Sequence, residues 1–416
     1  MCRAPIAAVL LRALLLATVA GSVPLAVTAS PEASEPAAEP ASGDTALRAS
    51  TANTDNYFAG ITALESEHGA YSAALPEQLL SLGLTLQQEG RHTDALDVFR
   101  RGVHLDRINN GLYSAGQVAL VQQEIISHIA LGDFAKADER QHYMYRVQMR
   151  TMNNGADRSK VFMEQAQWQY NAYRLDLGPA PYLRLMNMWD LYRLALNDTI
   201  NTHGKTSAYL LEPLEGMLLA QYLISGYERT SSPKSQTDLG VSLQTQDNRF
   251  NRYQRESYKR GRAVIQAIYD LHLVNHGENS AETTETMVMM GDWIFWHGDK
   301  EAALRAYQQA NAELVARGAD QQTIEATFAE PVALPNFDGV RPLPQPVQPG
   351  DGAVQLAFSV TATGKVRELE RVDENTLDDA TANKLMRKLR RTRFRPQLAL
   401  GEPVDTQRVL RAYDIQ

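Results

Sequence analysis

Two short motifs in this sequence are of types that hold phosphate or metal. The Gly-Lys-Thr tripeptide at 204–206 is similar to the end of a phosphate-binding loop, but Thr199 stands where that loop requires a glycine. His272 and His276 are four residues apart, which places two metal ligands on one face of a helix. No third ligand lies near them in the sequence, so we favour solvated or capping histidines and predict no metal and no cofactor.

The sequence motifs of several large enzyme classes are absent. There is no Gly-x-Ser-x-Gly, His-Glu-x-x-His or Gly-x-Gly-x-x-Gly, which are motifs of serine hydrolases, zinc proteases and dinucleotide-binding enzymes. The only cysteine is Cys2, so a mature chain without its N-terminus has neither a catalytic thiol nor a disulfide. The sequence therefore favours non-enzymatic binding. An enzyme in the helices around His272 and His276 is the less favoured alternative.

A basic run at 384–395 allows two interpretations. Leu385 and Leu389 are spaced as a buried stripe on a helix, and the basic residues then form its solvated face, which is the interpretation we favour. The alternative is an attractive patch for anionic envelope material or an acidic protein partner. The chain carries a formal net charge of −8, so we predict no nucleic-acid partner. The basic residues are Lys384, Arg387, Lys388, Arg390, Arg391, Arg393 and Arg395.

Residues 1–29 have the features of an export signal. Basic residues precede a short apolar segment, and Val27-Thr-Ala29 is a small-residue cleavage pattern. We predict cleavage after Ala29 and a periplasmic location. The alternative is an uncleaved inner-membrane anchor over 4–29 facing the periplasm, which would leave Arg12 in the bilayer at a cost of about 2.5–3.5 kcal/mol.

Two segments have the composition of linkers. Residues 30–55 are rich in Ala, Ser, Pro, Glu and Thr with few large apolar side chains, which predicts a disordered spacer. Residues 330–352 are rich in proline, which predicts a stiff extended linker that keeps the neighbouring domains apart.

Residues 56–329 show helical periodicity with short breaks marked by Gly or Asn. In the clearest unit, 76–107, Gly83, Gly90 and Phe99 have the spacing of a tetratricopeptide repeat, and we identify the region as similar to that family. The resemblance implies pairs of antiparallel helices that stack and bind proteins. Similar features recur at 125–137 and at 287–307. Because the glycines that mark the first two units lie further apart than the usual 34 residues, we expect a lengthened helix in the second unit.

Two segments between the second and third units lack a clear repeat pattern. Tyr182 to Leu196 carries aromatic residues at helical spacing, which favours core packing over a ligand-lined groove. Tyr227 to Asn251 is long and polar, and we favour a disordered loop there.

Residues 353–416 are predicted to form a small β-β-α-β unit. Val354, Leu356, Phe358 and Val360 alternate as a strand does, and a turn at Gly364 leads to a second strand. A helix follows and ends before the Arg-Phe-Arg-Pro sequence at 393–396, because proline disfavours helical geometry in the residue before it. The segment 404–413 alternates again as a last strand.

This order of parts, together with Gly401-x-Pro403-Val404, resembles the C-terminal domain of TonB-type energy transducers. The resemblance covers about the last sixth of the chain. It implies that an exposed sheet edge receives a segment of an outer-membrane transporter as an added strand. Members of that family have an anchored N-terminal helix with a histidine, and residues 1–30 contain no histidine. We therefore favour a periplasmic adaptor over an energy transducer.

The predicted architecture is a multidomain chain with an all-α helical repeat body, tetratricopeptide-like, and a small α+β C-terminal domain, TonB-like. The predicted function is protein–protein binding in the envelope of a Gram-negative bacterium, connected to transport across the outer membrane; the alternative is a membrane-anchored transducer for outer-membrane receptors. The predicted partner-binding residues are Thr406, Arg408, Leu410 and Ala412 at the sheet edge, Leu80, Leu84, Gln87 and Gln88 in the first repeat, and Asp292, Phe295 and Trp296 in the third.

Overall fold

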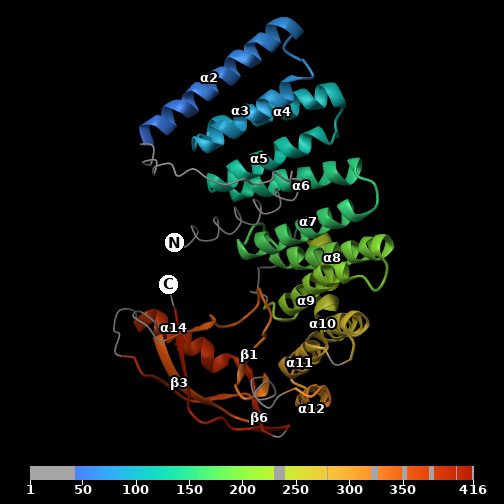
Figure 1. The fold of residues 1–416 in the computed structure, drawn as a ribbon, viewed down its shortest axis with the longest axis vertical. Helices are drawn as coiled ribbons and strands as arrows, with labels where there is room; N and C mark the ends of the chain where they lie inside the picture. Colours follow the sequence, from blue (N-terminus) through green and yellow to red (C-terminus); the bar gives the residue numbers. More distant parts are fainter. Residues whose placement is uncertain are drawn as a thin grey trace, which may run out of the picture. The chain divides into compact units, whose positions relative to one another are not determined.

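The computed structural model describes residues 43–228, 239–278, 280–319, 327–348, 354–373, 379–399 and 401–414 (Figure 1). The chain divides into two compact units: one runs to Val161 and includes Asn171–Pro179, and the other consists of Phe162–Tyr170 and the chain from Ala180 onward. No helix within the described ranges is long and apolar enough to cross a membrane. The predicted signal at 1–29 lies outside these residues.

The first unit is a succession of helices joined by short turns. They are α2 (Gly43–His68), α3 (Leu75–Gln88), α4 (His92–Asn110), α5 (Gly116–Ala130) and α6 (Phe134–Thr151), followed by α7 (Ala156–Arg174), which both units share. Each of α3 to α5 packs against the next helix in the chain.

Small residues hold the first helix pair close together, as its spacing predicted. A Cβ added to Gly83 would lie 2.1 Å from the Phe99 ring, so only glycine permits this approach of α3 to α4. The extra length between the first two units lies in α4, which has 19 residues, and in the turn after it. The lengthened helix that we expected in the second repeat therefore belongs to the first repeat, 76–107.

The second unit contains α8 (Pro181–His203), α9 (Leu211–Ser225), α10 (Leu239–His276), α11 (Ala281–Trp296) and α12 (Lys300–Ala316), with a short 3-10 turn, η1 (Ala208–Leu210), before α9. The same packing device recurs here. A Cβ on Gly291 would lie 2.4 Å from the Tyr307 ring, and one on Gly261 would lie 2.1 Å from Trp293. The predicted core role of the aromatic stripe in α8 is confirmed, since Trp189 and Tyr192 are buried.

The described parts of two segments expected to lack regular structure are helical. Residues 43–55 of the predicted spacer lie in α2, and α10 already begins at Leu239 within the segment that we expected to be a loop. Phe250 explains the second difference. It is fully buried, and its ring centroid lies 5.1 Å from that of Tyr182 and 5.4 Å from that of Tyr227. Contacts of Phe250 with aromatic residues from other parts of the sequence thus stabilise a helix in a mostly polar segment.

The C-terminal part is built on a four-stranded sheet in the order β2-β8-β3-β4. Its strands are β2 (Pro346–Val347), β3 (Val354–Val360), β4 (Val366–Arg371) and β8 (Val409–Tyr413), and α14 (Asp379–Arg391) follows β4. Two smaller sheets pair β1 (Val332–Leu334) with β5 (Arg393–Arg395) and β6 (Gln397–Ala399) with β7 (Glu402–Val404). The order of the predicted strands and helix is confirmed, with two short strand pairs added.

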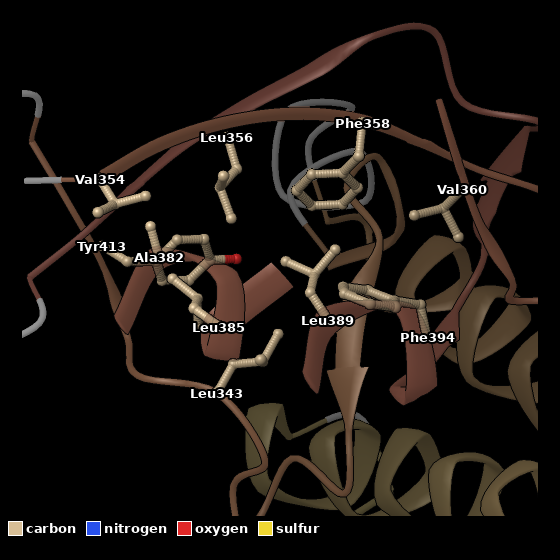
Figure 2. Packing of buried hydrophobic residues seen from close by; sticks show 10 residues of the cluster. All are labelled: Leu343, Val354, Leu356, Phe358, Val360, Ala382, Leu385, Leu389, Phe394 and Tyr413. Atoms are coloured by element: carbon tan, nitrogen blue, oxygen red, sulfur yellow. The ribbon is translucent and has the colours of Figure 1, made fainter. Parts of the chain in front are cut away.

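One face of β3 packs on α14. Leu356 and Phe358 point toward Leu385 and Leu389, and all four side chains are buried in one cluster (Figure 2). Burial of apolar surface of this kind stabilises a fold by about 25 cal/mol per Å². The predicted leucine stripe of the basic run is therefore the inner face of α14.

The proline-rich segment is part of this fold and does not keep the domains apart. Its residues 332–334 form β1, which pairs with β5, and Pro346 and Val347 pair with β8. Leu334 and Leu343 are buried. The prolines flank the three residues of β1, whose N–H groups remain free to bond to the neighbouring strand. The composition predicted a spacer because composition carries no information about strand pairing.

Candidate functional site

Helix α11 and strand β5 meet at a buried ion pair. The Nη1 atom of Arg395 lies 3.3 Å from both carboxylate oxygens of Asp292, and the hydroxyl of Tyr307 donates a hydrogen bond of 2.8 Å to Asp292 Oδ1. The side chains of Arg395 and Asp292 are each only 7% exposed. A buried charge is stable only when it is paired and hydrogen-bonded. The C-terminal part is therefore fixed to the last helix pair by a specific contact.

Burial governs the protonation of this cluster. It raises the pKa of the Asp292 carboxyl, while the Arg395 guanidinium and the Tyr307 hydroxyl limit that rise by stabilising the carboxylate. Burial and the Asp292 charge also raise the pKa of Tyr307 well above its ordinary value. Tyr307 therefore stays a hydrogen-bond donor at neutral pH.

Three further contacts surround the ion pair. Arg393 Nη1 donates to the carbonyl of Trp296 at 2.8 Å, and Gln308 Nε2 donates to the carbonyl of Gly401 at 3.4 Å. Gly364 approaches so closely that an added Cβ would lie 2.8 Å from the Phe295 ring. We call this set of contacts, centred on Asp292, Tyr307 and Arg395, the docking contact.

The residues predicted to line a partner groove in the third repeat lie in this docking contact. Asp292 and Phe295 are buried, and Trp296 is half-buried. All three contact or bond to the C-terminal part of the same chain, so this surface is already occupied within the molecule. The three residues thus contact the chain itself, and their binding to another protein stays a prediction.

The predicted groove residues of the first repeat lie on α3. Leu84 is 37% exposed and Gln88 is exposed, whereas Leu80 is half-buried. Gln87 has a structural role, because its Nε2 donates to Ser127 Oγ at 2.8 Å and to the Gln123 carbonyl at 3.0 Å.

The prediction that β8 is a free sheet edge is wrong. β8 lies between β2 and β3, and Ala412 faces Val347 on one side and Gln355 on the other. Thr406 accepts a hydrogen bond of 2.7 Å from the Val360 N–H. The segment 346–347, expected to be linker, supplies the covering strand.

The other two residues predicted for that edge are exposed. The Arg408 side chain pairs with Glu370 of β4, and Leu410 is 57% exposed. The two outer strands of the described sheet are β2, which covers β8, and β4 at the opposite edge.

A cavity of about 1000 Å³ opens beside the docking contact. The basic face of α14 forms one side, and the end of α9 and the end of α11 contribute Gly226, Trp296 and His297. Leu334 of β1 adds an apolar surface. The basic residues of α14 are exposed, as predicted, and Lys384, Arg387, Lys388 and Arg391 line this cavity.

The surroundings of His297 change its pKa. Its ring lies among aromatic rings, 4.4 Å from Trp293 and 5.2 Å from Tyr258 between centroids. Burial, and then the charge of Arg393, lower the pKa of His297 to about 4. In the unfolded chain the His297 ring is protonated with its ordinary pKa of 6.5. Between pH 6.5 and 4 the unfolded state therefore binds more protons than the folded state. The folded state loses stability as the pH falls through this range.

We expect this loss to be about 1–2 kcal/mol for His297, since the ring is not fully buried. Urea unfolding of wild type and His297→Gln at pH 7 and at pH 4.5 measures it. The difference in stability between the two pH values should be smaller in the variant. An equal difference in both proteins would show that His297 is not the group responsible.

Both motifs considered first lie at the end of a helix. Gly204 ends α8 with a φ of 86°, so the Gly-Lys-Thr tripeptide lies in the loop between α8 and η1, and its Lys and Thr do not begin a helix as they do in a phosphate loop. His272 and His276 contact each other through their rings. In the described part of the chain, no group of three or more His, Cys, Asp or Glu residues is placed to hold a metal.

Of the three central residues of the docking contact, Arg395 and Tyr307 were not assigned to it from the sequence. A signal for the contact was present in α11, where Asp292 interrupts the apolar sequence Met-Val-Met-Met-Gly-Asp-Trp-Ile-Phe-Trp. A carboxylate in such a helix requires a buried partner.

No family model and no curated protein matches the sequence. Among solved structures, a Podosopora anserina protein described as a kinesin light chain with nearly identical TPR-like repeats is 11% identical, with a TM-score of 0.36, over 59% of this chain and 97% of that one. BtubC (BKLC) from P. vanneervenii is 15% identical, with a TM-score of 0.35, over 67% of this chain and 94% of that one. These TM-scores are low, and the tetratricopeptide-like character of the body rests here on its own helix pairs.

Proposed function

We propose that this chain is a non-enzymatic binding scaffold whose N-terminal helix pairs hold a protein partner. The observation that carries the proposal is the contrast between two equivalent surfaces. Asp292 and Phe295 of the last pair are buried against the C-terminal part, whereas Leu84 and Gln88 of the first pair are exposed. Stacked helix pairs present such surfaces to other proteins.

Leu80, Leu84 and Gln88 recur at positions i, i+4 and i+8 and so follow one face of α3. Exposed apolar side chains rimmed by polar ones are typical of protein interfaces. A partner helix or extended segment that covers Leu84 would remove it from water. The α3 strip, defined as Leu80, Leu84 and Gln88, is the proposed binding surface.

A more specific proposal is that the scaffold binds its partner in the bacterial envelope. It is supported by the export-like residues 1–29 and by the absence of any cysteine after Cys2. A link to outer-membrane transport rests on the resemblance of the C-terminal part to TonB-type domains. Recovery of Ser30 as the first residue of the mature chain supports the adaptor, and an uncleaved N-terminus supports the anchored transducer.

Strand addition is less well supported by the geometry than binding at the α3 strip. The outer strand β4 carries charged residues along its length and pairs with β3 through a register shift. Glu368 has a φ of 52°, which interrupts the regular strand. Charges and bulges of this kind protect a sheet edge from pairing with another chain.

We expect Leu84→Glu to reduce capture of the protein partner by about tenfold or more, because a charge at the centre of an apolar contact must be desolvated. Wild type and variant are immobilised, exposed to the same envelope extract, and the captured proteins are quantified by mass spectrometry. Leu131→Glu is the matched control, since Leu131 is also exposed (49%) but lies at the end of α5. Capture of the same proteins in the same amounts by wild type and Leu84→Glu would contradict the proposal.

A further inference from the structure

We propose that the cavity beside α14 binds an extended acidic segment of a partner protein, in which acidic residues alternate with apolar ones. This deepens the proposed binding function by giving it a second surface and a defined chemistry. Its residues are separate from the α3 strip, so its test does not depend on the result for Leu84.

The cavity gathers cations that have no acidic partner among the described residues. Five basic side chains line it, and Glu228 is the one carboxylate among the residues that line it. Within the described ranges none of the five forms an ion pair, whereas Arg371, Arg395, Arg408 and Arg411 of the same domain are each paired with a carboxylate. The five are Lys384, Arg387, Lys388, Arg391 and Arg393.

The gathering of five such cations around one cavity points to a ligand. Like charges held near one another repel, and a fold gains nothing from gathering them unless an anion neutralises them. The guanidinium groups of Arg387 and Arg391 also present planar pairs of donors that match a carboxylate. The cations of the cavity are thus suited to several carboxylates arranged in a row.

The spacing of the cations gives the form of the ligand. Lys384, Lys388 and Arg391 are at positions i, i+4 and i+7 of α14 and therefore share one face. Four residues of helix rise by about 6 Å. Two residues of an extended chain rise by about 6.6 Å, and their side chains point to the same side. An extended peptide with acidic residues at alternate positions places one carboxylate opposite each turn of α14.

Part of the cavity lining is apolar. It consists of Trp296, Leu334, Pro335 and Pro342. The intervening side chains of an extended peptide point away from α14, and apolar side chains at these positions suit such a lining. The volume of about 1000 Å³ is at the upper end of the range for small-molecule sites, which suits a peptide of several residues.

The test is a titration of the full chain against a fluorescein-labelled peptide of about ten residues in which glutamate alternates with valine, followed by fluorescence anisotropy. We expect binding that weakens as salt is added, because the contacts are exposed and screened. The double variant Lys384→Glu/Arg391→Glu should bind about tenfold or more weakly, from the summed loss of several ion pairs. Circular dichroism of the variant checks that it is folded.

Arg390→Glu is the matched control. Arg390 is exposed on the same helix but does not line the cavity. Its substitution changes the charge by two units, as Arg391→Glu alone does, so the single variant Arg391→Glu is measured beside it and should bind the peptide more weakly than Arg390→Glu. We expect the affinity of Arg390→Glu for the peptide to stay within about twofold of wild type, since only long-range charge is altered. An equal loss in Arg390→Glu and in the double variant would overturn the proposal, because binding would then depend on net charge alone.

Two further probes separate the ligand classes. A peptide of the same composition with its glutamates in one block should bind more weakly than the alternating one. A single-stranded oligonucleotide of equal charge should also bind more weakly, because Trp296 offers a single ring for stacking. Tighter binding of the oligonucleotide, or no measurable binding of the alternating peptide, would overturn the proposal.

Discussion

Arg395→Ala is expected to lower the free energy of unfolding of the second unit by about 3–5 kcal/mol, because it leaves the Asp292 carboxylate buried without its cation. Asp292 keeps only the hydrogen bond from Tyr307 in that variant. Urea unfolding followed by tryptophan fluorescence measures the change. All four tryptophans of the chain, including Trp293 and Trp296, lie in the second unit, so the signal reports on this part.

Arg408→Ala is the matched control. Arg408 belongs to the same domain and pairs with Glu370, but its side chain is 63% exposed. An exposed ion pair contributes about 0–1 kcal/mol, so the control should unfold almost as wild type does. Equal and small losses in both variants would show that the Asp292–Arg395 pair does not stabilise the fold.

Gly364→Ala is expected to lower the free energy of unfolding by about 2–5 kcal/mol, the second large effect. Gly364 has a φ of 76°, which costs an L-residue about 1–2 kcal/mol. An added Cβ would also lie 2.2 Å from the Phe394 carbonyl oxygen and 2.8 Å from the Phe295 ring. Overpacking of this kind adds about 1–3 kcal/mol. Urea unfolding again gives the value.

Gly318→Ala separates the two causes. Gly318 has a φ of 72°, but no atom lies within 4 Å of an added Cβ. Its substitution should cost only the backbone contribution of about 1–2 kcal/mol. If Gly364→Ala is no more costly than Gly318→Ala, the close approach of Gly364 to Phe295 and Phe394 is absent in solution.

The local parts of this fold could be predicted from the sequence because their signals are local. Gly83 and Phe99 lie within one helix pair, and the alternation of Leu356, Phe358 and Val360 lies within one strand. Each pattern describes the face that an element buries, and that face is set by the helical or strand period.

The docking contact could not be predicted in this way. Arg395 is more than one hundred residues from Asp292, and its basic neighbours favoured a solvated face. The proline-rich segment was interpreted from composition alone, although pairing with β5 and β8 decides its structure. Long-range pairing also places β8 inside the sheet. Asp292 and Phe295 are predicted from the sequence to bind another protein, but their contact with the C-terminal part depends on the tertiary fold.

A double-mutant cycle between Asp292→Asn and Arg395→Gln tests most directly whether the C-terminal part is held on the last helix pair. The two residues belong to α11 and β5, so a coupling energy between them in unfolding by urea requires that these elements touch. We predict a coupling of about 2 kcal/mol, in the upper range for residues in contact. A coupling within about 0.3 kcal/mol of zero would contradict the docking contact.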